Sequence, residues 1–268
     1  MRKIISMIVA IPLVIGIAAG VAFARGGITI KGSTTVLPIA QACAEAYMGK
    51  NPNVDISVQG GGSGVGIASI IDGTADIGDA SRPIKDKELD EAVSGGVQPK
   101  AHVVAMDGIA VIVHPSNPIN ALTRSQIKDI YTGKTSKWPD GSDIVVISRD
   151  SSSGTFEAFN ELALGKAKVR PDALLQASNK AVATTVAKTP GAIGYVGLGY
   201  VSGEVKAVTV DGVEASKETV LSNEYPLSRP LFMYTNGAPS GEVKGFIDFV
   251  KSKEGQVIAE KSGYVGLR

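Results

Sequence analysis

Residues 27–80 alternate short strands with helices, and this alternation constrains the fold more than any other feature of the chain. Three short runs of alternating or apolar side chains predict strands: Gly27–Lys31, Val54–Val58 and Ala75–Ala80. Between them, apolar residues recur at helical spacing from Leu37 to Tyr47 and again from Ile67 to Ile71. Because a βαβαβ order needs crossover helices, the segment predicts an α/β layer with a parallel sheet.

The rest of the chain predicts a second α/β half that interrupts the first. After Val97, two apolar runs, Ala101–Met106 and Gly108–His114, are separated by Asp107 alone. The later predicted helices cover 124–131, a segment ending near Leu164, 181–188, 243–250 and 255–261. The later predicted strands cover 144–147, 192–196 and 225–234, the last interrupted by two prolines, and a hairpin is predicted around Asp211-Gly212. We therefore expect one lobe from residues 25–107 and 225–268, and a second lobe from residues 108–224.

The first 24 of the 268 residues have the pattern of a secretory signal peptide. Arg2 and Lys3 supply a basic start, residues 4–21 are almost entirely apolar, and Ala22-Phe23-Ala24 gives the small-x-small ending of a cleavage site. We expect cleavage and export to a bacterial periplasm. An uncleaved membrane anchor is the alternative, since the apolar run is close to spanning length.

Charge and residue content exclude several kinds of partner and site. The chain has 27 basic and 26 acidic residues, and without Arg2 and Lys3 the balance is 25 to 26. This near-neutrality argues against nucleic acid and anionic membranes, which favour basic patches. Cys43 is the single cysteine, so no internal disulfide can form, and its helical spacing with neighbouring apolar residues predicts a buried structural thiol. His102 and His114 lie in apolar runs and are also expected to be structural, so we expect no metal and no cofactor.

Three Ser/Thr/Gly-rich turns each lie between a predicted strand and a predicted helix. They are Gly32–Thr35, Gly60–Gly64 and Ser151–Thr155, and Arg149 precedes the last of them at the end of an apolar strand. Each helix N-terminus supplies unpaired N–H donors and about half a positive charge, to which hydroxyl groups and a guanidinium add further donors. One such turn is usually only a helix cap. Three of them, all beyond the carboxyl ends of strands, predict one shared anion site.

Other motifs of phosphate chemistry fail on spacing. The Gly133-Lys134-Thr135 sequence has Lys128 at the position where a phosphate-binding loop requires its first glycine. The glycines of residues 60–66 do not give the dinucleotide-binding spacing, and neither Ser63 nor Ser153 lies in a nucleophile-elbow motif. These mismatches argue against a nucleotide-binding enzyme and against a serine hydrolase.

Four motifs occur in a specific order along the chain. They are Gly32-Ser33-Thr34-Thr35 with Pro38, Gln59–Gly64, Asp76–Pro83, and Arg149-x-x-x-Ser153-Gly154-Thr155. Together they resemble the motifs of the periplasmic phosphate-binding proteins of phosphate ABC transporters, within the type II periplasmic binding proteins, over essentially the whole mature chain. The resemblance implies two α/β lobes, each a mixed, mainly parallel sheet flanked by helices, that close on the ligand like a hinge.

Carried over position by position, the resemblance also implies ligand groups on both lobes. Donors from the first two helix starts would face a charged fork and the donors of the third helix start. The implied phosphate-binding residues are Thr34, Thr35, Ser63, Arg149, Ser153, Gly154 and Thr155.

Ser81 departs from the pattern of the family. Many members have an aspartate at this position, which accepts the proton of hydrogen phosphate and repels fully ionised sulfate. Ser81 can still accept a proton but repels sulfate less, Arg82 is a candidate second cation, and Asp79 or Asp150 is a candidate substitute acceptor. The sequence therefore predicts oxyanion binding more firmly than selectivity for phosphate.

The resemblance implies a non-enzymatic receptor that captures inorganic phosphate and delivers it to an inner-membrane ABC permease. We expect a monomer without a nucleic-acid partner. The nearest competing hypothesis is a receptor for another tetrahedral oxyanion, such as sulfate, molybdate or arsenate. Two more distant hypotheses are an exported phosphohydrolase with Ser153 as nucleophile and a surface or signalling module that has lost its ligand.

Overall fold

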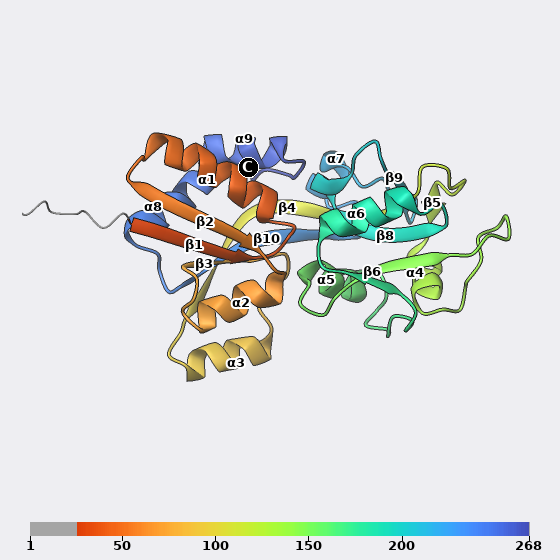
Figure 1. Ribbon diagram of the computed structural model, residues 1–268, viewed down its shortest axis with the longest axis horizontal. Helices are drawn as coiled ribbons and strands as arrows, with labels where there is room; N and C mark the ends of the chain where they lie inside the picture. Colours follow the sequence, from red (N-terminus) through yellow and green to blue (C-terminus); the bar gives the residue numbers. More distant parts are fainter. Residues whose placement is uncertain (1–25, 268) are drawn as a thin grey trace, which may run out of the picture.

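The computed structural model describes residues 26–267 (Figure 1). The signal peptide predicted over residues 1–24 lies outside this range. The strands are β1 Gly26–Gly32, β2 Val54–Gly60, β3 Ile77–Ala80, β4 Pro99–Val113, β5 Ala121–Leu122, β6 Val145–Arg149, β7 Leu174–Gln176, β8 Ala192–Gly197, β9 Lys206–Val210 and β10 Ser228–Asn236. The helices are α1 Leu37–Lys50, α2 Ser63–Ile71, α3 Asp86–Ser94, α4 Arg124–Tyr131, α5 Gly154–Leu162, α6 Asn179–Lys188, α7 Lys217–Leu221, α8 Gly241–Lys251 and α9 Lys253–Lys261, with a 3-10 turn η1 at Leu198–Tyr200.

The first lobe contains the predicted βαβαβ unit. Strand β1 lies between β2 and β3 and pairs in parallel with both, so that Ile30 faces Val58 on one side and Ile77 on the other. The prediction of a parallel sheet is confirmed here. Strand β10 extends this sheet by antiparallel pairing with β3. Helices α1, α8 and α9 cover one face of the sheet and α2 and α3 the other, each side with its own apolar core (Figure 1).

The second lobe is a mixed sheet with helices on both faces. Strand β8 pairs antiparallel with β4 and parallel with β6, and β7 continues the sheet parallel to β6. On one face, Phe159 of α5 stacks on Tyr195 with ring centroids 3.9 Å apart, and α4 packs beside it. On the opposite face, α6 packs against β8. Helix α4 has the predicted bounds because Thr123 and Gln126 form a capping box at its start.

Strands β4 and β10 pass from one lobe to the other (Figure 1). The two apolar runs on either side of Asp107 form one continuous strand, β4, with no break at Asp107. The reason is the register of the antiparallel pair, which places Arg229 directly opposite Asp107. Because the two charges meet inside the sheet, the chain can stay extended through Asp107.

Two further local predictions need correction. Strand β10 runs through Pro230 without a break, with a register shift between Leu231 and Phe232 absorbing the irregularity. The hairpin around Asp211-Gly212 has its turn, with both residues at positive φ, but its second arm is reduced to a single bridge from Val213 to Val210. Strand β9 pairs instead with β4 and β5. Helices α3 and α7, the 3-10 turn η1 and the short strands β5 and β7 were not predicted.

Cys43 and the histidines occupy structural positions. Cys43 is fully buried in α1, as predicted, and burial together with the nearby Asp79 raises the pKa of its thiol to about 12. His102 Nε2 lies 2.9 Å from Thr235 Oγ1, and His114 Nδ1 lies 2.7 Å from Ser116 Oγ. Within residues 26–267, none of the helices combines the length and the apolar character needed to cross a bilayer.

Candidate anion-binding site

The three Ser/Thr/Gly turns meet where the two lobes touch. Thr35 Oγ1, before α1, lies 2.8 Å from Thr155 Oγ1 in the first turn of α5. Ser63, at the start of α2, accepts a hydrogen bond of 2.9 Å from the amide of Ser81. A Cβ atom on Gly154 would lie 2.1 Å from Ser63 Oγ, so this approach of α5 to α2 requires glycine. We call Thr35, Ser63, Ser81 and Thr155 the hydroxyl hub.

Serine hydroxyls bind backbone amides at two of the helix starts around the hub. Ser33 Oγ accepts from the amides of Thr35 and Val36 at 3.1 and 3.4 Å. Ser153 is the N-cap of α5, where its Oγ accepts from the amide of Phe156 at 3.1 Å. The Ser153 hydroxyl oxygen therefore already serves the helix. In α2 the amide of Gly64 donates to the carbonyl of Ser152 at 2.9 Å, which ties the second turn to the third.

Arg149 ends β6 with one edge of its guanidinium bound and the other free. Its Nε donates to the carbonyl of Gln176 at 2.8 Å and its Nη2 to the carbonyl of Ala177 at 3.1 Å. Nη1 is buried and finds no acceptor among residues 26–267. Burial lowers the pKa of Arg149, the positive charge of Arg229 lowers it further, and Asp150 opposes both effects. A buried cation with an unused N–H edge is suited to an anion.

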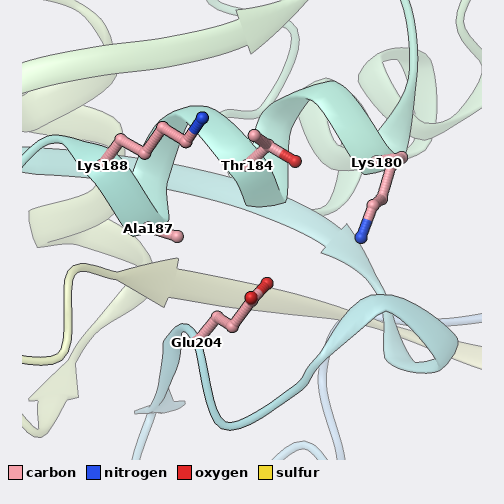
Figure 2. Close-up of a pocket in the computed structure, with 5 residues that line it drawn as sticks. All are labelled: Lys180, Thr184, Ala187, Lys188 and Glu204. Carbon is pink, nitrogen blue, oxygen red and sulfur yellow. The ribbon is translucent and has the colours of Figure 1, made fainter.

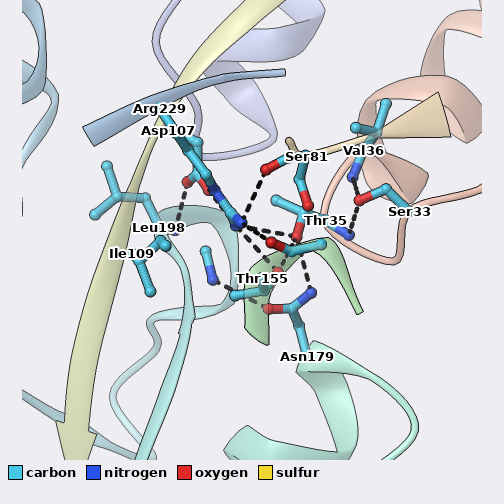
Figure 3. A network of polar contacts seen from close by, with 12 residues as sticks. Ser33, Thr35, Val36, Ser81, Asp107, Ile109, Thr155, Asn179, Leu198 and Arg229 are labelled. Carbon is cyan, nitrogen blue, oxygen red and sulfur yellow. Dashed lines mark hydrogen bonds and ion pairs between the residues drawn. The ribbon is translucent and has the colours of Figure 1, made fainter. Parts of the chain in front are cut away.

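Arg229 is the cation that contacts the hub, and sequence reasoning missed it. Its Nη2 lies 3.1 Å from Thr155 Oγ1 and 3.3 Å from Thr35 Oγ1, and its Nη1 donates to the carbonyl of Ser81 at 3.2 Å (Figure 3). Its Nε and Nη2 also bind Asp107 Oδ2 at 3.0 and 2.8 Å. Burial raises the pKa of Asp107, and Arg229 with the amide of Leu198 opposes that rise. Opposite charges at facing positions of two apolar strands were the signal that could have revealed this pair.

Asn179 and Tyr200 also contact the first turn, and neither was predicted. Asn179 Nδ2 donates to Thr35 Oγ1 at 3.0 Å (Figure 3). It also donates to Thr34 Oγ1 at 3.0 Å, while Asn179 Oδ1 accepts from the amide of Gly197. Tyr200 donates from its hydroxyl to the carbonyl of Thr34 at 2.6 Å. These second-lobe residues fix the turn of the first lobe, and only the tertiary fold places them there.

Arg82 lies outside the hub, although the sequence made it a candidate second cation for the ligand. Its Nη1 and Nη2 donate to the two oxygens of Glu88 at 2.8 and 2.6 Å, and its Nε forms an ion pair of 2.5 Å with Glu157. Two carboxylates therefore already neutralise this guanidinium. The cation that contacts the hub hydroxyls is Arg229.

The two candidate substitute acceptors are placed differently from each other. Asp150 Oδ1 accepts from the amide of Ser152 at 2.9 Å and from its hydroxyl, so it folds back on its own turn. Asp79 is buried close enough to Cys43 to affect that thiol, and burial raises the pKa of its carboxyl well above the usual value. The carboxylate in contact with the hub cation is Asp107.

A separate groove of about 540 Å³ runs along α6 (Figure 2). Lys180 and Lys188 line it from the helix, and Glu204 faces them from the loop after η1. Both lysines and Glu204 are exposed, and the groove contains none of the hub residues. Its charges are those of a solvated surface.

The comparisons with known proteins cover nearly the whole chain. The family profile described as the PBP superfamily domain matches residues 18–254. The phosphate-binding protein PstS of Bacillus subtilis is 35% identical over 257 residues, covering 92% of this chain and 83% of that protein. PstS of Pseudomonas aeruginosa is 34% identical, with 90% and 83% covered.

Solved structures agree with these relatives. A structure from Clostridium perfringens, described as a phosphate ABC transporter substrate-binding protein with bound phosphate, superposes with a TM-score of 0.85 at 38% identity and covers 91% of this chain and 100% of that chain. An ABC-type phosphate transport receptor from Vibrio cholerae gives a TM-score of 0.74 at 32% identity, covering 90% and 100%. The predicted two-lobed type II periplasmic binding fold is thereby confirmed. The chain belongs to the PBP superfamily and, within it, to the PstS family of phosphate-binding proteins.

Proposed function

We propose that this protein captures inorganic phosphate between its two lobes and delivers it to the membrane permease of an ABC transporter. The relatives named above are phosphate-binding proteins and phosphate transport receptors, which are solute-binding proteins and not enzymes. The observation that carries the proposal is the free Nη1 edge of Arg149, a buried cationic donor at the end of β6, in the segment that leads into α5. An anion supplies the acceptor that this donor needs.

The proposed ligand groups come from both lobes. From the first lobe, Thr34, Thr35 and Ser63 offer hydroxyl and amide donors, and Ser81 offers a hydroxyl. From the second lobe, Arg149 offers its free edge, and Ser153, Gly154 and Thr155 offer the first donors of α5. Arg82 is removed from this set because Glu88 and Glu157 engage it, and Arg229 takes the place of the second cation.

In this proposal, phosphate binds by replacing hydrogen-bond partners that the site residues have in its absence. The hydroxyls of Thr35 and Thr155, which contact each other at 2.8 Å, can turn their protons toward ligand oxygens instead. Helix starts from opposite lobes then share one anion, which holds the lobes together. Because the bonds are hydrogen bonds to fixed dipoles and cations, capture is reversible and needs no covalent step.

The lobe boundaries and the location of the protein are part of the same proposal. We assign residues 25–107 and 225–268 to the first lobe and 108–224 to the second, with β4 and β10 as the crossing strands. We also propose that the protein is exported by its signal peptide, acts in the periplasm and is a monomer.

Titration calorimetry of phosphate-stripped protein tests the proposal. We expect saturable heat with one phosphate bound per chain, and absence of any phosphate heat would contradict it. Competition with sulfate, molybdate and arsenate tests the hypothesis of a different oxyanion ligand. One observation favours that hypothesis: both oxygens of Asp107, the carboxylate at the hub, are engaged by Arg229 and the amide of Leu198. Asp107 is therefore poorly placed to select for a protonated anion.

A further inference from the structure

A cluster of four charged side chains joins the two lobes beside the hydroxyl hub. Arg82, Lys85 and Glu88 lie between the end of β3 and the first turn of α3, in the first lobe. Glu157 lies in the first turn of α5, the helix whose N-terminus carries Ser153, Gly154 and Thr155. We call Arg82, Lys85, Glu88 and Glu157 the ion cluster.

The contacts in the ion cluster are short, and all of its side chains except Lys85, which is 52% exposed, are largely shielded from water. Glu157 pairs with Arg82 Nε at 2.5 Å through one oxygen and with Lys85 Nζ at 2.6 Å through the other. Glu88 binds Arg82 through both oxygens at 2.8 and 2.6 Å. The Arg82 side chain is only 6% exposed, and those of Glu157 and Glu88 are 18% and 21% exposed. Charge pairs in such surroundings are screened less than surface pairs.

Glu88 makes the first-lobe side of the cluster rigid. Burial opposes its ionisation, but the hydrogen bonds from Arg82 and from the amide of Lys85 outweigh that effect and lower the pKa of Glu88. Arg82 is further fixed by donating from Nη1 to the carbonyl of Pro83 at 2.8 Å. Arg82 is therefore held in place from its own lobe, and Glu157 is the partner that must arrive from the other.

The two sides of the ion cluster are anchored in different lobes, so the cluster forms only when the lobes are close together. Helix α3 packs through Ala92 into the small core formed with Ile67 and Ile70 of α2. Helix α5 packs through Phe159 into the core of the second lobe. A groove of about 700 Å³ separates the two helices and reaches Ser81 and Arg229 at the hub. Opening of the lobes must therefore separate Glu157 from Arg82 and Lys85.

We propose that the ion cluster is an interlobe latch in which Glu157 positions the N-terminus of α5 against the first lobe and stabilises the closed, anion-binding arrangement. This inference rests on the proposed function, because the latch acts on phosphate affinity. Glu157 is a positioning residue: it contacts Arg82 and Lys85, and it acts on the ligand through the helix start at Ser153–Thr155. The latch resists opening and so slows ligand release.

Charge alone predicts the opposite effect for Glu157. Removing a carboxylate near an anion site reduces repulsion and should tighten binding of a dianion. Loss of the latch should weaken binding, because closure is then less favourable. The sign of the change in affinity thus separates the two accounts.

Glu157→Gln tests the latch, with Glu161→Gln as the matched control. Glu161 lies one turn further along α5 and lines the same groove, but it pairs with Lys166 of its own lobe at 3.3 Å. We expect Glu157→Gln to weaken phosphate binding at least about threefold through faster dissociation in stopped-flow measurements. Glu161→Gln should leave phosphate affinity unchanged or slightly tighter. Small-angle scattering of phosphate-stripped protein should show a larger radius of gyration for Glu157→Gln alone.

A double-mutant cycle over Lys85→Gln and Glu157→Gln measures the coupling between the two residues in phosphate affinity. A purely structural role of the pair would not produce this coupling. A coupling in phosphate affinity, with thermal unfolding of the stripped proteins equal within error, supports the latch. Phosphate binding by Glu157→Gln as tight as wild type, or tighter, overturns it. Failure of the wild-type protein to bind phosphate would instead overturn the proposed function.

Discussion

Arg82 follows the end of β3 and Arg149 is the last residue of β6. The two are almost equally buried, at 5% and 2% exposed, yet their partners differ completely. Arg82 forms ion pairs with Glu88 and Glu157 and donates a hydrogen bond to the carbonyl of Pro83. Arg149 is held along one edge by two backbone carbonyls and keeps Nη1 without an acceptor in residues 26–267. Burial and charge alone therefore do not mark a ligand residue. Arg82 Nε also lacks a hydrogen bond, but the carboxylate of Glu157 lies 2.5 Å from it, whereas the Asp150 carboxylate lies 3.9 Å from Arg149 Nη2. The marker is a buried cationic donor with neither a hydrogen-bond acceptor nor a close carboxylate.

The free N–H edge of Arg149 distinguishes this residue from Arg82, and removing that edge should have the largest effect. Arg149→Ala should weaken phosphate binding by about 100-fold or more, because hydrogen bonds between a buried cation and an anion are the strong ones. Calorimetry measures the loss. Arg149→Lys keeps the charge without the planar fork and should recover only part of it. If thermal unfolding shows a folded Arg149→Ala protein with wild-type affinity, the free Nη1 has no role in binding.

The next largest effect is expected where the lobes approach most closely. In Gly154→Ala the added Cβ would lie 2.1 Å from Ser63 Oγ and must push α5 away from the first lobe. We expect phosphate affinity to fall about tenfold or more, with little change in the stability of either lobe, because both cores are untouched. Gly203→Ala, at a position where a Cβ meets nothing within 4 Å, is the matched control. Wild-type affinity in Gly154→Ala would show that this close approach is not needed for binding.

The smallest expected effect is the pH dependence of stability contributed by Glu88. Its pKa in the folded protein is lowered from the usual 4.5, mainly by Arg82 and the amide of Lys85 acting against burial. A lowered folded-state pKa stabilises the protein above pH 4.5, and this contribution is lost as pH falls through the folded-state value. Thermal unfolding should therefore show a wild-type advantage over Glu88→Gln at pH 7 that shrinks below pH 4.5. A constant difference across that range would contradict the assigned ionisation of Glu88.

Much of the fold was predictable because local signals and tertiary packing agree. The parallel unit β1–β3 follows from alternation of strand and helix patterns, and helix α4 follows from its cap at Thr123. The continuous strands β4 and β10 were not predictable by local rules. Asp107 and Pro230 each read as interruptions, and only the register that pairs Asp107 with Arg229 explains how the chain stays extended.

The candidate site likewise contains parts that were predictable from the sequence and parts that were not. The Ser/Thr/Gly turns were recognisable because a turn between a strand and a helix is encoded locally, and the structure brings them together. Asn179 and Arg229 contact the hub, and Tyr200 contacts the neighbouring Thr34, from distant segments that no local spacing indicates. The role of Arg82 could not be read from its motif, because its partner Glu157 is contributed by the other lobe.

A crystal structure of the protein with phosphate tests the central claim most directly. We predict one phosphate between the starts of α1, α2 and α5, with Arg149 Nη1 within hydrogen-bond distance of a phosphate oxygen and Arg82 still paired with Glu88 and Glu157. A phosphate bound elsewhere, or one contacted by Arg82 while Arg149 Nη1 remains without an acceptor, would contradict this account.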